Sequence, residues 1–157
     1  MSKIRGRFNS FEGQIQVARR FEDSRIDVVI DAESIDTGVN MRDTHLRSAD
    51  FLDVENYPKL YFSSTKFHQV RGDRWLIDGA FTLRGTSSNV QLDTAYLGQR
   101  TWQGPGFESD RRAACRATTT LRREDYAVNW QATLAKGIAV VGPTIEIELG
   151  VQAVLEQ

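Results

Sequence analysis

The dominant pattern along the chain is an alternation of apolar and polar side chains with a period of two. It is clearest at residues 25–31, 74–84 and 145–153. In the last of these runs, aliphatic side chains at odd positions alternate with Glu, Gly and Gln at even positions. Such alternation is typical of a strand with one buried and one solvated face. We therefore predict strands at all three places.

Turn residues separate these runs in the manner of antiparallel hairpins. Gly72-Asp73 lies between the alternating runs 59–70 and 74–84, which predicts a tight hairpin. Residues 85–88 and 142–143 contain further turn residues, with Gly, Ser and Pro. The chain therefore reads as successive strands joined by short connections.

Two segments break the alternation. Residues 40–48 place Met41 and His45 on one helical face, which predicts a short helix with Asn40 as its N-cap. Residues 99–110 contain Gly104, Pro105 and Gly106 and are predicted to form a long loop. One helical insert among closely spaced strands favours an antiparallel β-barrel rather than an alternating α/β fold.

Length and charge narrow the picture further. The 157 residues fit one domain, residues 1–157, with one sizeable core. A net charge of -1 gives no general electrostatic reason to expect binding to nucleic acid. Acidic residues flank the arginine-rich stretch 111–123, with Glu108 and Asp110 before it and Glu124 and Asp125 after it, so we predict a solvated strand face. No apolar run is long enough for stable membrane insertion.

Few residues suggest catalysis or metal binding. Cys115 is the single cysteine and lies in an alternating run, so we expect a buried, unreactive thiol. The two histidines, His45 and His68, are far apart and lack paired ligands, so no metal and no cofactor are predicted. No nucleophile elbow of the G-x-S-x-G type is present. We therefore expect a protein that is not an enzyme.

The most polar cluster beside the predicted helix is Arg42, Asp43 and His45. Three interpretations remain open: a structural latch for the helix at the barrel mouth, contact with a ligand head group, and chemistry on a small amphiphile. The Arg123-Glu124-Asp125 turn is interpreted as a corner that holds the preceding strand against the segment carrying Trp130.

Several motifs together resemble the YceI-like, polyisoprenoid-binding family. They are SIDTG at 34–38, RDTHLRSADF at 42–51, YPKLYFSS at 57–64, GAFTLRGT at 79–86 and REDYAVNW at 123–130. The resemblance covers nearly the whole chain in the family's order. It implies an extended lipocalin-like antiparallel barrel whose hydrophobic tunnel binds polyisoprenoids or other long-chain amphiphiles.

The apolar faces of the alternating runs supply a candidate tunnel lining. Burial of each ligand CH₂ is worth roughly 0.8 kcal/mol, so a long tail needs few polar contacts. The same side chains alone would equally suit a stress-related structural protein with a filled core. The predicted lining comprises Phe8, Ile15, Ile26, Val28, Ile30, Phe62, Trp75, Ile77, Phe81, Leu83, Leu92, Tyr96, Trp130, Ile145, Ile147 and Leu149. With the resemblance, we predict a carrier or store for a polyisoprenoid, a prenyl quinone or a long-chain fatty amphiphile.

The N-terminus departs from the family's pattern. The family's first strand and part of its second would precede Lys3, so we expect a barrel that is short of one strand. The two strand edges left open favour a homodimer or an exchange of edge segments. The first residues lack the apolar core of a secretory signal, which favours the cytoplasm unless a leader has been removed.

Overall fold

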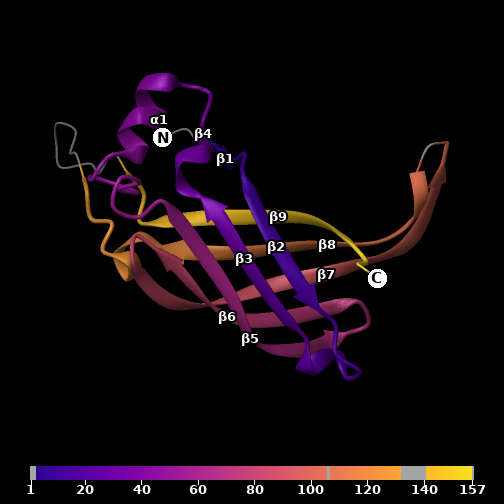
Figure 1. The fold of residues 1–157 in the computed structure, drawn as a ribbon. Coiled ribbons are helices and arrows are strands. Elements are labelled where there is room, and N and C mark those ends of the chain that lie inside the picture. The colour runs from indigo at the N-terminus through magenta and orange to yellow at the C-terminus, as the bar shows by residue number, and fades with distance from the viewer. Residues whose placement is uncertain (1–2, 106, 132–140, 157) are drawn as a thin grey trace.

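The computed structural model describes residues 3–105, 107–131 and 141–156, most of which belong to one curled antiparallel sheet (Figure 1). The seven strands of this sheet lie in chain order. They are β2 (Phe11–Gln16), β3 (Arg25–Asp31), β5 (Lys59–Arg71), β6 (Arg74–Leu83), β7 (Thr86–Gly104), β8 (Phe107–Arg122) and β9 (Thr144–Val154). The prediction of an antiparallel, lipocalin-like barrel fold is confirmed.

The sheet curls into a half-barrel that stays open between its first and last strands. Among the described residues, β2 pairs only with β3, and β9 pairs only with β8. The exposed ion pair between Lys3 Nζ and Glu146 Oε2, at 2.8 Å, links the N-terminal segment to the beginning of β9. The open edges that we expected are therefore present in the described part of the chain.

A small helical layer covers one end of the half-barrel. Helix α1 (Asn40–Arg47) follows the short pair β1 (Arg7–Phe8) and β4 (Ile35–Asp36), as Figure 1 shows. The predicted helix is confirmed, but the predicted cap is wrong. Val39 occupies the N-cap position without a side-chain bond, and Asn40 is already helical. Asn40 instead offers its carbonyl to the hydroxyl of Thr44, at 2.9 Å.

The two hairpins flanking β6 depend on residues with positive φ. Gly72, at φ 55°, forms the predicted turn between β5 and β6. The next turn lies at Arg84 and Gly85, with φ 51° and 72°. Two consecutive positive values are what the tightest hairpin turns require. The predicted turn at 85–88 was therefore placed too late, because residues 86–88 already pair with β6.

The predicted loop at 99–110 is wrong. The β7–β8 ladder continues through this region and ends within it, at the pair Gly104 and Phe107. β6 pairs with β7 only as far as Ala95, and β9 pairs with β8 only as far as Arg112. The far part of β7 and β8 is consequently a two-stranded arm, visible in Figure 1 beyond the rest of the sheet. Gly104 and Pro105 thus lie at the tip of a hairpin, and Gly106 lies outside the described residues.

Candidate ligand-binding site

The strand register brings most of the predicted lining residues to one face of the sheet. Val28 lies opposite Phe62, and Phe62 lies opposite Phe81. On the next strands, Leu92 pairs with Ile77, and Tyr96 pairs with Cys115. Because paired residues point to the same side of a sheet, these side chains form one continuous apolar face.

The same face continues onto both edge strands. On β2, Ile15 pairs with Ile26. On β9, Ile145, Ile147 and Leu149 lie opposite Leu121, Thr119 and Ala117 of β8, respectively. Four more predicted lining residues belong to the same core and are buried or half-buried: Ile26, Ile30, Trp75 and Leu83.

Burial falls from the centre of this face toward its edges. Phe62, Ile77 and Leu92 are at most 7% exposed, so they form the packed centre of the half-barrel. At the edges, Phe11 on β2 is 64% exposed and Ile145 on β9 is 43% exposed. The open side of the half-barrel therefore carries accessible apolar surface, which is the usual composition of a lipid-binding cleft.

An aromatic cluster stands at the helical end. The ring of Trp130 lies 4.7 Å from that of His45 and 5.2 Å from that of Phe51, between ring centroids. His45 also contacts Phe51 edge-on and has its Nε2 atom 2.8 Å from Asp50 Oδ2. The predicted lining residue Trp130 therefore meets the predicted mouth residue His45 directly.

Arg42 and Asp43 fasten the helix to the preceding segment. Asp43, 6% exposed, accepts hydrogen bonds from the backbone N–H of Thr37 at 2.9 Å and from its hydroxyl. Arg42 donates to the hydroxyl and to the carbonyl of the same Thr37, at 2.8 and 2.9 Å. These contacts are those of a structural latch, and contact with a head group stays a prediction for this pair.

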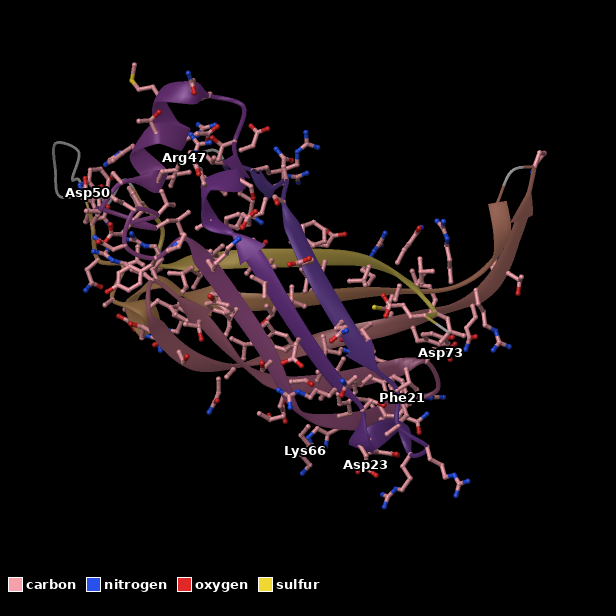
Figure 2. All side chains as sticks on the ribbon, in the orientation of Figure 1. Phe21, Asp23, Arg47, Asp50, Lys66 and Asp73 are labelled. Atoms are coloured by element: carbon pink, nitrogen blue, oxygen red, sulfur yellow. The ribbon has the colours of Figure 1, made fainter. Side chains whose placement is uncertain are left out.

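A second aromatic cluster stands at the opposite end. Phe21, in the short 3₁₀ helix η1 (Phe21–Asp23), contacts Phe67 at 5.5 Å and Trp75 at 4.6 Å between ring centroids. Figure 2 shows Phe21 at the end of the sheet remote from Arg47 and Asp50. The apolar face thus runs from one aromatic cluster to the other.

Some of the predicted residues and neighbours lie elsewhere than expected. Phe8 lies in β1, outside the seven-stranded sheet, and packs half-buried against the core. Arg123, assigned to a solvated face, is only 9% exposed and donates a hydrogen bond to the Trp130 carbonyl at 2.9 Å. A buried guanidinium joining two segments explains why this turn forms a corner, as the sequence predicted.

Counting every second residue from Phe62 as inward-facing misses the core residue Phe67. A register shift between Ser64 and Lys66 moves the buried face from even to odd positions within β5. Phe67 is therefore 3% exposed, although strict alternation from Phe62 would place it outside. The five-residue spacing of the two phenylalanines was the available signal for a β-bulge.

Cys115 lies on the apolar face, half-buried between its pairing partners Tyr96 and Val151. Burial raises the pKa of its thiol. A protonated thiol is a poor nucleophile, so Cys115 acts here as a small apolar side chain. No group of three or more His, Cys, Asp or Glu within the described ranges could hold a metal ion. In the same ranges, no helix is long and apolar enough to cross a membrane.

Comparison with known proteins places this architecture in a family. The pattern that defines the YceI-like domain matches residues 1–153. The chain belongs to the YceI-like family. Among curated relatives, an UPF0312 protein of Vibrio parahaemolyticus is 32% identical over 130 residues, covering 81% of this chain and 66% of the relative. An UPF0312 protein of Vibrio cholerae is 30% identical over 158 residues, covering 98% of this chain and 75% of the relative.

This YceI-like chain spans about two thirds of the length of these relatives. A UPF0312 protein of Pectobacterium atrosepticum, for example, is 34% identical to it, and the match covers 64% of that protein.

Solved structures show the same fold. A mutant YceI protein of Campylobacter jejuni with a monobromobimane guest has a TM-score of 0.83 at 21% identity, covering 100% of this chain and 88% of that one. Burkholderia cenocepacia BcnA has a TM-score of 0.76 at 18% identity, covering 94% and 86%.

Proposed function

We propose that this YceI-like protein binds one long apolar chain, such as a polyisoprenoid, a prenyl quinone or a fatty amphiphile, for carriage or storage. One observation carries the proposal. A continuous apolar face runs between the two aromatic clusters, and its edges, at Phe11 and Ile145, are exposed. A lipid tail covering these edges would gain roughly 0.8 kcal/mol for each CH₂ that it buries.

The first experiment looks for the ligand and then supplies one. Native mass spectrometry and solvent extraction of the purified protein should reveal a bound lipid. A prenyl quinone or a fatty amide, added to stripped protein, should raise the melting temperature, because a ligand at 100 times its Kd stabilises by about 2.7 kcal/mol. Absence of both a co-purifying lipid and a thermal shift would overturn the proposal.

A pair of neighbouring substitutions on β9 locates the ligand. Val151 is half-buried on the apolar face, whereas Gln152 is exposed on the other face. Val151→Lys places a charge where the tail would lie, so it should weaken lipid binding at least tenfold, as measured by displacement of a fluorescent fatty acid. Gln152→Lys, the matched control, should bind as the wild type does.

Cys115 provides a reporter that needs no substitution. The thiol lies on the proposed binding face, beside Val151. A bound chain would cover it, so stripped protein should react with a maleimide faster than loaded protein does. Equal labelling rates with and without lipid would place the ligand elsewhere.

A further inference from the structure

The end of the half-barrel opposite helix α1, called the remote end below, is built from neighbouring segments of the chain. Phe21 of η1 packs against Trp75, near the start of β6. In the β5–β6 turn, the Asp73 carbonyl accepts a hydrogen bond from the N–H of Tyr96, at the base of the arm, at 2.8 Å. Figure 2 shows Phe21, Asp23 and Asp73 together at this end. The segments are residues 17–24, 70–75, 96–100 and, where β9 ends beside β8, 111–112 and 154–156.

Each of these segments exposes an aliphatic side chain. Val17, Val70, Leu97 and Leu155 are all more than half exposed. Leu97 occupies the extra position of a bulge in β7, between Tyr96 and Gly98, and therefore lacks a direct partner on β8. Single exposed aliphatic residues are ordinary, but their gathering on several segments at one end marks an interaction surface.

Arginines accompany the exposed aliphatic side chains. One lies within three residues of Val17, of Val70 and of Leu97, and another offers its carbonyl to the Leu155 N–H, at 2.9 Å. All of these arginines are exposed, and within the described ranges none forms an ion pair. They are, in chain order, Arg19, Arg71, Arg100 and Arg111. An unpaired guanidinium binds phosphate through two parallel hydrogen bonds, so phosphate is the group that these side chains fit.

Acidic side chains nearly balance the arginines. Glu22, Asp73 and Glu156 lie on the segments of the remote end, and Arg20 pairs with Asp23 at 4.0 Å. Long-range attraction is therefore weak, and docking depends on short-range contacts. A phospholipid bilayer carries its phosphates directly above hydrocarbon. This order of groups suits a long arginine that stands beside a shorter aliphatic side chain.

We propose that the remote end docks on the surface of a phospholipid bilayer. Its unpaired arginines bind lipid phosphates, and the aliphatic side chains beside them enter the boundary of the hydrocarbon layer. The inference goes beyond the proposed function, because the docking residues lie outside the apolar face and need no ligand there.

Sedimentation with vesicles of mixed phosphatidylcholine and phosphatidylglycerol tests the docking. The wild type should sediment with these vesicles. Leu97→Asp removes an aliphatic side chain from the contact and should weaken vesicle binding about tenfold. Met41→Asp is the matched control, since it adds the same charge at an exposed apolar position on helix α1, and it should bind as the wild type does.

A second pair of variants tests the arginines. The double variant Arg71→Gln and Arg100→Gln should also weaken vesicle binding about tenfold, because each cation at a phospholipid surface contributes to binding. The control removes two exposed arginines from the N-terminal segment beside helix α1, through Arg5→Gln and Arg7→Gln, and should leave vesicle binding unchanged. Melting temperatures equal to that of the wild type would establish that the variants remain folded.

The outcomes separate this proposal from the proposed function. Failure of the wild type to sediment with vesicles would overturn the docking proposal, whatever the fatty-acid displacement assay shows. Equal losses at Leu97 and Met41, or in the two arginine pairs, would place the contact elsewhere and overturn it too. Support requires that Leu97→Asp lose vesicle binding and still bind the fluorescent fatty acid as the wild type does.

Discussion

Gly79 is required by the close approach of a neighbouring ring. A Cβ atom at this position would lie 2.5 Å from Cε2 of Phe62, on the adjacent strand. The phenylalanine thus packs over the glycine at the centre of the apolar face. Because that ring is itself 7% exposed, it has little room to move away.

Gly79→Ala should therefore destabilise the protein by about 1–3 kcal/mol, the usual cost of overpacking a core. Urea unfolding followed by tryptophan fluorescence would measure the change. Gly150→Ala is the matched control, since nothing lies within 4 Å of a Cβ built there on β9. Equal losses in the two variants would show that the contact with Phe62 is not the cause.

Asp27 should make the folded state sensitive to acid. Its hydrogen bond from Arg25, at 2.8 Å, and then that from Ser63, at 2.6 Å, hold the pKa of the carboxyl below its ordinary value of 3.8. A carboxyl whose pKa is lower in the folded than in the unfolded state stabilises the fold at pH values above its unfolded-state pKa. This contribution disappears as the pH falls through the folded-state pKa. The stability advantage of the wild type over Asp27→Asn should therefore shrink below pH 3.8. Thermal unfolding from pH 6 to pH 3 would measure it; a constant difference would contradict the assignment.

At the residue scale, the alternation in the sequence predicted the inward-facing residues correctly only where the strand backbone is regular. Where pairing is uninterrupted, as along β6, alternation identified Ile77 and Phe81 as inward-facing. The bulge in β5 reversed the alternation and hid Phe67.

At the scale of elements, the acceptor Asp43 is one of the groups that fasten helix α1 to the preceding segment. Asp43→Ala would leave the partly buried N–H and hydroxyl of Thr37 without their shared acceptor, so a loss of about 1–2 kcal/mol in stability is expected. Met41→Ala, on the same helix but 85% exposed, is the control and should change little. Chemical denaturation measures both variants. If the Asp43 variant unfolds like the control, the latch does not stabilise the fold.

The elements themselves were predictable when a periodic pattern and a turn signal agreed. The hairpin at Gly72 satisfies this condition. The helix at 40–47 was predicted from its spacing alone, and its cap was placed one residue too late. The arm formed by β7 and β8 does not, because its glycines and proline suggested a loop throughout. A long ladder between two strands depends on pairing across the hairpin, and that information is not local.

At the scale of the whole molecule, we propose that the open edges of β2 and β9 pair with a second copy of the chain. Unpaired edges beside exposed apolar groups such as Phe11 favour strand addition. Light scattering should show a concentration-dependent dimer. Phe11→Lys places a charge on the inner side of the edge and should shift the equilibrium to monomer, whereas Glu12→Lys, on the other face, should do so less. A monomer at all concentrations would overturn this proposal.

The architecture could be predicted further than the ligand. Alternation and turns led to an antiparallel barrel, whose described strands end at β2 and β9. The chemistry of the proposed ligand came only from resemblance, because the same apolar side chains, such as Phe62 and Leu92, would serve either a filled core or a lipid site. A gradient of exposure toward Ile145 became visible only in three dimensions.

The placement of the aromatic clusters determines how a chain molecule would be exchanged. Phe21 and Trp130 stand at the two ends, while the long side between β2 and β9 is uncovered in the described part of the chain. In a monomer, whose β2 and β9 edges are unpaired, a tail would then enter sideways along its length, without threading through a pore. Release would then proceed one segment of the tail at a time, because each segment can leave the apolar face through the open side without the rest of the tail moving first.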